Sequence, residues 1–192
     1  MIRPGQHSRG GIRGLVVCLL ALAVGAGSLV RPVKAQSAAI NEVRAAFLVN
    51  FAKFVEWPPD AFLSDTSPFV IGVLGDDTIA YFLRREINRS KPINGHELTV
   101  RIMKPDGPIR SCHVLYVGDL DAKLTDRILE TLKNSPVFTV SAMDRFAIAG
   151  GVAQLIFEND QMRFAINLPA AHRARLLLSS KLMTLAKSPT QP

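Results

Sequence analysis

The sequence predicts a single α/β domain of the Rossmann-like kind, with a mostly parallel sheet flanked by helices and followed by a C-terminal β-hairpin and helix. Two observations predict this class. Apolar runs of strand length alternate with amphipathic helical segments through the middle of the chain, as in a parallel sheet with helices on its faces. Later, apolar residues alternate with polar ones after a tight turn, which is typical of a hairpin. One domain is expected over residues 36–187, with a disordered tail at 188–192.

The first element is a helix over residues 38–55. Its apolar residues recur at spacings of three and four, which is typical of a helix with one buried face; they are Ile40, Val43, Phe47, Phe51 and Phe54. Pro58 disfavours helical geometry at Trp57 and ends the helix near there. The opposite face has too few cations for a membrane-surface helix, so packing on a sheet is favoured. Trp57 is either a lid over the core or a partner contact.

The alternation of strands and helices follows between residues 68 and 141. A strand is expected in FVIGVLG, within residues 68–77, where Gly and two Asp residues then begin a helix. Further strands and helices are expected, in chain order, at 78–89 (helix), 97–104 (strand), 113–118 (strand), 119–134 (helix) and 136–141 (strand). Turns separate them at 91–96 and 105–108.

The C-terminal part changes character. Asn159-Asp160 forms the turn of the predicted hairpin, because apolar and polar residues alternate after it up to residue 168. The segment 169–187 then has the composition of a helix that is interrupted near Ser179-Ser180.

Residues 1–35 have the features of a removable export signal. Arg3, Arg9 and Arg13 form a basic start, and an apolar run of sixteen residues follows at 15–30. That run is short for a spanning helix, which needs about 20 residues. Cleavage is expected near Ala35-Gln36; the alternative is an uncleaved membrane anchor.

Removal of the export signal changes the net charge that is relevant to the protein's partners. Five of the 23 Lys and Arg residues precede residue 36, whereas all 16 acidic residues follow it. The mature chain therefore has 18 basic and 16 acidic residues, a net charge of about +2. A nucleic-acid partner is not expected, since its electrostatic footprint is a basic stripe.

The remaining His and Cys residues do not form a catalytic or metal motif. His96, His113 and His172 are far apart in sequence, so there is no local zinc pair. Cys112 and His113 are adjacent on a predicted strand and point to opposite faces. We expect no catalytic residue, no metal and no cofactor. Cys112 is either buried and inert, which is favoured, or a thiol that pairs between chains.

Two glycine-containing segments are candidate binding sites. Gly75, Asp76 and Asp77 follow the first strand of the sheet, where α/β proteins often bind ligands. Helix capping is the stronger interpretation of the two carboxylates, and no dinucleotide fingerprint is present. The loop FAIAGGVAQL, residues 146–155, is either the turn before the hairpin or a surface for a partner or ligand.

Five stretches resemble the YfiR-like family in this order: AAFLVNFAKFVEWP, FVIGVLGDD, CHVLYVG, VFTVS with FAIAGGVAQLIFEN, and RFAINLPAAHRARLLLSSKLMTLAK. The match covers residues 40–187. The ending FAKFVEWP of the first helix and the closing INL…SSKL are its specific parts, whereas the strands between them are generic.

The resemblance implies a small exported α/β protein of the periplasm. The name-giving member restrains an inner-membrane diguanylate cyclase by binding its periplasmic sensing domain, and loss of that restraint raises cyclic di-GMP and promotes biofilm formation. Members of this type are linked to dimerisation, so a homodimer is a further expectation, and to redox-sensitive disulfides.

One departure from the family concerns these disulfides. A family cysteine in the first strand can pair with the one before the second apolar strand; here Cys112 is present, but Gly72 occupies the first-strand position. A second family pair, near the glycine loop, is also missing. The resemblance thus implies that no disulfide forms inside one chain.

The leading hypothesis is a non-enzymatic periplasmic regulator that binds a diguanylate cyclase or other membrane sensor. Its expected partner contacts are Trp57, Phe146, Ile148, Gly150 and Gly151, together with the hairpin. The second hypothesis is a small-molecule-binding module that uses Gly75, Asp76 and Asp77. A hydrolase that uses Asp76, Asp77 or His113 is the third.

Overall fold

The computed structural model describes residues 33–189, and the domain considered below comprises residues 37–189. The export signal expected at residues 1–35 lies outside the described residues, apart from the helical backbone of 33–35, and remains a prediction. Residues 190–192 of the expected tail also lie outside them.

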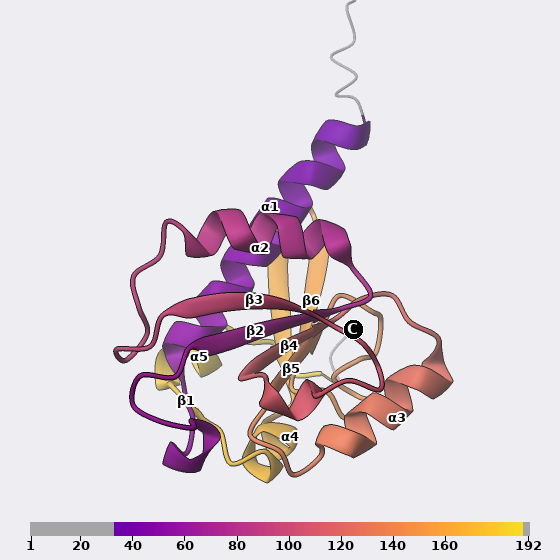
Figure 1. The fold of residues 1–192 in the computed structure, drawn as a ribbon. Helices are drawn as coiled ribbons and strands as arrows, with labels where there is room; N and C mark the ends of the chain where they lie inside the picture. Colours follow the sequence, from indigo (N-terminus) through magenta and orange to yellow (C-terminus); the bar gives the residue numbers. More distant parts are fainter. Residues whose placement is uncertain (1–32, 190–192) are drawn as a thin grey trace, which may run out of the picture. The chain divides into compact units, whose positions relative to one another are not determined.

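The central element is a mostly parallel sheet, which confirms the predicted fold class (Figure 1). Within the described residues it has six strands: β2 (Phe69–Leu74), β3 (Leu98–Met103), β4 (Val114–Val117), β5 (Phe138–Ser141), β6 (Ala153–Glu158) and β7 (Gln161–Ile166). Their spatial order is β3-β2-β4-β5-β6-β7. All neighbours pair in parallel except β6 and β7, which form the predicted antiparallel hairpin.

Helices begin where the sequence supplies capping side chains. The helices of the described residues are α1 (Val33–Phe54), α2 (Asp77–Ile87), α3 (Ala122–Leu132), α4 (Leu168–Arg173) and α5 (Ser180–Leu185). Asp76 Oδ1 accepts a hydrogen bond from the Ile79 amide at 3.1 Å, and Ser179 accepts one from the Leu182 amide. The predicted interruption near Ser179 is therefore confirmed, because this serine caps a new helix.

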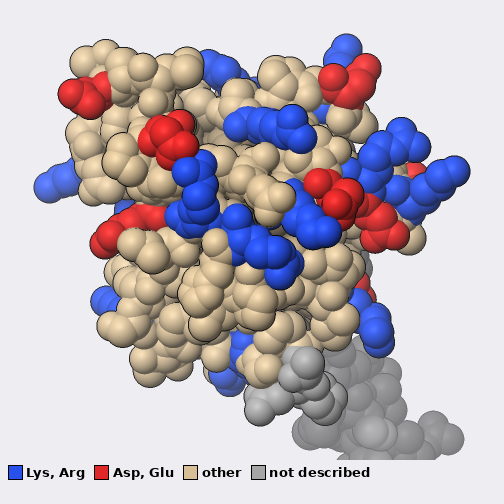
Figure 2. Space-filling model, turned by 90° about the horizontal axis from the view of Figure 1, so that it is seen from below, with Lys and Arg blue, Asp and Glu red and all other residues tan. Residues whose placement is uncertain are grey.

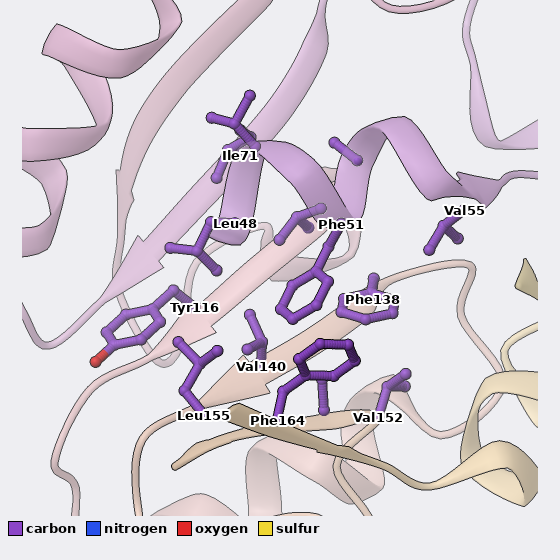
Figure 3. Close-up of a cluster of buried hydrophobic side chains, with 14 of the residues drawn as sticks. Leu48, Phe51, Val55, Ile71, Tyr116, Phe138, Val140, Val152, Leu155 and Phe164 are labelled. Atoms are coloured by element: carbon purple, nitrogen blue, oxygen red, sulfur yellow. The ribbon is translucent and has the colours of Figure 1, made fainter. Parts of the chain in front are cut away.

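One face of the sheet is covered by α1 and α2, and a single apolar core lies beneath them (Figures 1 and 3). Leu48 and Phe51 of α1 and Val55, which directly follows α1, share one buried cluster with Phe138 and Phe164 of the sheet. The ring centroids of Phe51 lie 5.2 Å from those of both sheet phenylalanines.

The predicted stripe of α1 is correct for Phe51 but wrong for Val43, which is 42% exposed. The buried face of α1 is instead centred on its residues Ala45, Leu48 and Ala52. The two small alanine side chains let the helix lie close to the sheet, and the larger Phe47 and Phe54 pack at the border of the core.

The other face has a second core beneath α3. The connections β3–β4 and β5–β6 contain no α-helix on this side, and each sends apolar side chains inwards instead. Ile109 comes from the short 3-10 helix η2 (Ile109–Ser111), and Phe146 comes from the loop after β5. Both are buried in the second core, so loop residues fill space that a helix would otherwise cover.

The C-terminal region contains a small sheet that the sequence did not predict. Strand β1 (Val55–Glu56) pairs antiparallel with β8 (Leu177–Leu178) and ties the end of α1 to the C-terminal segment. The short 3-10 helix η1 (Pro59–Ala61) follows β1. Asn159 and Asp160 both have positive φ, as a two-residue hairpin turn requires.

Candidate functional site

The strand order creates a natural crevice at the carboxyl ends of β2 and β4. The connection after β2 runs to β3 on one side, and the connection after β4 runs to β5 on the other. This reversal is a topological switch point, where α/β proteins bind ligands. The two strand ends approach closely, since a Cβ on Gly118 would lie 2.7 Å from the Gly75 oxygen. Asp76 and Asp119, which follow these glycines, therefore emerge next to each other.

A cavity of about 370 Å³ lies at this edge. We call it the carboxyl-edge cavity; its lining residues are Arg44, Asp76, Tyr116, Gly118, Asp119, Ser141, Ala142, Met143 and Asp144. They come from α1 and from the ends of β2, β4 and β5. A site of this kind gathers polar side chains from distant parts of the chain around one space.

Tyr116 joins the core to this cavity. Its ring is 2% exposed and packs among the apolar residues beneath α1, and its hydroxyl points away from them (Figure 3). Burial raises the pKa of the phenol to about 12, with a smaller lowering influence from Arg44 and raising influences from Asp76 and Asp119. The hydroxyl is therefore a protonated donor near one cation and two carboxylates.

Of the three residues predicted to bind a ligand, one lines the cavity. Asp76 lines it while its Oδ1 caps α2. Gly75 has φ of 77° and supplies the turn at the strand end, whereas Asp77 lies exposed in the first turn of α2 and does not line the cavity. Asp119 was missed, although the sequence repeats Gly-Asp after an apolar strand at 118–119.

The opposite, amino edge of the sheet is filled by aromatic rings. Phe62 stacks against both His96 and His113, with ring centroids 4.1 Å and 4.4 Å away, and Phe69 also stacks against His113 at 4.7 Å. Trp57 packs edge-on against Phe69, and its Nε1 donates a hydrogen bond to the His113 carbonyl at 3.1 Å. Trp57 thus acts as a lid on this end of the core, which was the favoured prediction.

His113 is the buried polar centre of this stack. Its Nδ1 accepts a hydrogen bond from the Val70 amide at 2.9 Å, so the neutral ring carries its proton on Nε2. Nε2 is buried and makes no hydrogen bond of normal geometry within the described residues. Burial lowers the pKa of His113 to about 4, the carbonyl of Ala61 opposes this slightly, and the nearby His96 adds to it. His113 is therefore uncharged at neutral pH.

A second cavity adjoins the lid. Its volume is about 600 Å³, and its lining includes Trp57, Pro58, Pro59, His172 and Leu177. Leu177 is 65% exposed, so a large apolar side chain faces solvent at the rim. A surface of this composition suits contact with another protein.

The loop after β5 is only partly exposed, although the sequence analysis considered it as a partner surface. Phe146 is 1% exposed in the second core, so its assignment as a partner contact is wrong. Gly151 lies against the Phe146 ring, since a Cβ there would be 2.1 Å from a ring carbon. Ile148 is 48% exposed, and Gly150 has φ of 114° with open space around it. These two residues remain available to a partner.

Cys112 is a buried thiol. It is 2% exposed, and burial raises its pKa to about 11, a shift that the Arg101 charge and a hydrogen bond to the Gly72 backbone partly offset. A Cβ added to Gly72 would lie 2.4 Å from the Cys112 sulfur, so the two positions face each other as the resemblance implied. An inter-chain disulfide would require this core to open.

Clusters of potential metal ligands and membrane-spanning helices are both absent from the described part of the chain. Across residues 33–189, no three His, Cys, Asp or Glu side chains are grouped so that they could hold a metal ion. None of the helices in this range has the length and apolar character needed to cross a membrane.

The fold and its cavities define a small mostly parallel α/β domain with a ligand-sized crevice at one edge and an aromatic lid at the other. Residues 41–187 match the family model described as YfiR/HmsC-like. The chain therefore belongs to the YfiR/HmsC-like family. No curated protein matches the chain.

Proposed function

We propose that this chain is a non-enzymatic regulator that works in the periplasm. It binds the periplasmic part of an inner-membrane diguanylate cyclase and lowers cyclic di-GMP output and biofilm formation. The observation that carries the proposal is the family match over residues 41–187, which spans nearly the whole described domain. The export signal expected from residues 1–35 supports the compartment.

The regulator acts by mass action. A protein that binds the inactive conformation of its partner more tightly than the active one shifts the partner towards inactivity by that difference in affinity. No covalent chemistry is needed. A homodimer of the chain is compatible with this role and remains a prediction, which sedimentation analysis of the purified protein tests directly.

The surface around the second cavity is the contact that we propose. Leu177 is exposed there beside Trp57, Pro58 and Pro59, which are fixed by the aromatic stack and by the β1–β8 pair. An ion pair between Arg175 and Asp60, 2.9 Å long, joins the two sides of this region. Because the apolar residues of this rim are already ordered before binding, association costs less conformational entropy.

Figure 2 shows basic side chains crossing the middle of one face of the molecule, with acidic side chains on either side of them. This face therefore carries both signs of charge rather than a field of one sign. Such a surface suits a specific protein partner better than a general polyanion.

The test measures intracellular cyclic di-GMP in a deletion strain, in the same strain with the full gene restored, and in one with a copy that lacks residues 1–35. The level should rise on deletion and return only with the full gene. If deletion leaves the level unchanged while the wild-type strain makes the protein, the proposed function is wrong.

A matched pair of variants tests the surface. Leu177→Asp places a charge on the proposed contact, whereas Leu185→Asp does so at a leucine of nearly equal exposure, 66% against 65%, that does not line the cavity. Only Leu177→Asp should fail to restore the low level, with both variants present at wild-type amounts. Equal behaviour of the two variants would place the contact elsewhere.

A further inference from the structure

The carboxyl-edge cavity contains hydrogen-bond donors that the described residues leave unused. Tyr116 is 2% exposed, its hydroxyl reaches the cavity, and it donates to no described residue. Arg44 lies on another wall; its Nη1 donates to Asn41 Oδ1 at 3.1 Å, and its Nε is buried without a partner among the described residues. A buried tyrosine whose hydroxyl opens onto a cavity and is used by no described side chain indicates a bound molecule with an oxygen acceptor.

The charges of the same cavity indicate a second property of that molecule. Asp76, Asp119 and Asp144 line the space, against Arg44 as the single cationic residue of the lining. One oxygen of Asp76 caps α2, and one oxygen of Asp144 accepts from the Arg145 amide, so each keeps a further oxygen for a ligand. The excess of negative charge favours a cation.

The arrangement of the carboxylates separates an organic cation from a metal ion. A divalent cation needs several oxygen ligands at about 2.0–2.6 Å around one point. The three carboxylates line one cavity without forming such a group. Separated carboxylates suit an ammonium group whose N–H bonds diverge towards them. The volume of about 370 Å³ lies within the range of small-molecule sites, about 300–1,000 Å³.

We propose that the carboxyl-edge cavity is a binding site for a small primary amine that also carries oxygen acceptors. The ammonium lies against Asp119, Asp76 and Asp144, and the oxygen atoms accept hydrogen bonds from Tyr116 and Arg44. The position at the switch point between β2 and β4 supports the site independently of the charges. Binding is a property of this chain alone, so the proposal stands or fails separately from the proposed cyclase partner.

Isothermal titration calorimetry on the purified chain tests the proposal with two probe pairs. Glucosamine is compared with glucose, and ethanolamine with ethylene glycol, so that each pair differs in the amino group. At least one amine should bind about tenfold or more tightly than its neutral counterpart, as expected for a hydrogen bond to a charged group. Magnesium chloride should not displace it.

Variants then assign the binding to this cavity. Asp119→Asn and Tyr116→Phe keep the size of their side chains, and each should weaken the amine about tenfold. Asp65→Asn, an exposed change ahead of β2 at the opposite edge, should leave the affinity unchanged. Thermal unfolding of each variant confirms that it is folded. The proposal is overturned if neither amine binds in the millimolar range, if amine and neutral probe bind equally, if magnesium displaces the amine, or if Asp119→Asn and Tyr116→Phe bind like wild type.

Discussion

The two edges of the sheet are built differently although both lie on the same strands. At the amino edge, His113, which precedes β4, lies in a stack of rings and is bonded to Val70 and Trp57 through its side chain and its carbonyl. At the carboxyl edge, Tyr116 of β4 leaves its hydroxyl unbonded in a cavity that the described residues do not fill. The filled end and the open end thus lie three positions apart along the chain.

This difference indicates a division of roles along one strand. The filled amino edge stabilises the domain mainly through the dispersion contacts of its rings, since Nε2 of His113 is buried there without a partner among the described residues. An open end leaves a hydroxyl to water in the ligand-free chain, at little cost in stability, and is kept where a ligand supplies the partner. Substitutions at the amino edge should therefore alter stability, whereas matched substitutions at the carboxyl edge should alter binding.

The largest effect should follow truncation of Phe69. This ring is 1% exposed and contacts Trp57, Phe62 and His113. Phe69→Ala should lower the free energy of unfolding by about 3–5 kcal/mol, since it removes a buried ring and leaves a cavity. Denaturant titration followed by circular dichroism measures the loss.

Leu63→Ala is the control: Leu63 is 100% exposed, so its truncation should change stability by less than about 0.5 kcal/mol. A small loss for Phe69→Ala would show that the stack is not tightly packed.

The next effect is a dependence of stability on pH that arises at His113. Its pKa is about 4 in the folded chain, against an ordinary value of 6.5. Between these values the unfolded chain binds a proton that the folded chain does not, so stability should fall as the pH drops from 6.5 to 4 and level off below 4. The full loss from this group should reach up to about 3 kcal/mol. Above pH 6.5 this group should contribute no slope.

A variant separates His113 from the other groups that titrate in this range. His113→Asn keeps an oxygen where Nδ1 accepts from Val70, but it cannot take up a proton. The variant should be less stable than wild type at pH 7, since the stack is lost, but its unfolding free energy should change less between pH 6.5 and 4. Parallel slopes for the two proteins would mean that the acid sensitivity arises elsewhere.

A smaller effect is expected for Trp57→Phe. The change keeps an aromatic ring near Phe69 but removes the Nε1 donor that bonds to the His113 carbonyl. One hydrogen bond contributes about 1 kcal/mol, so stability should fall by about that amount plus a small loss of packing. Chemical unfolding at pH 7 measures it. No loss at all would indicate that water replaces the indole donor at this carbonyl.

The sheet could be predicted from the sequence because the patterns that indicate its strands are local. Strands β2, β4 and β5 are buried on both faces, so each has a short continuous apolar sequence. Asp76 and Ser179 indicate where helices begin, because their side chains cap these helices. Gly72 was placed correctly against Cys112 through the family resemblance. The rotation of α1 was missed because its aromatic residues outweigh its alanines in a periodic pattern, although the small residues decide how close a helix can lie.

The candidate site was harder to predict because it depends on non-local pairing. Asp76, Asp119 and Asp144 come together only because β2, β4 and β5 are neighbours in the sheet. Phe146 was assigned to the surface because a loop has no periodicity that reports burial. The β1–β8 pair has two residues in each strand, which is too few for any alternating pattern.

The smallest expected effect completes the comparison between the two edges. Tyr116→Phe removes one hydroxyl, much as Trp57→Phe removes one N–H, but this hydroxyl has no partner among the described residues. The free energy of unfolding of the ligand-free chain should therefore change by less than about 0.5 kcal/mol, because no hydrogen bond within the domain is lost. Chemical unfolding at pH 7, alongside Trp57→Phe, measures the difference between the two edges.

Because burial raises the pKa of this phenol to about 12, the hydroxyl stays protonated and the result should not vary between pH 5 and 9. A loss comparable to that of Trp57→Phe would show that the hydroxyl is bonded within the domain and would remove the contrast. An unchanged stability together with weakened amine binding would instead show that this end of β4 is kept open for a ligand.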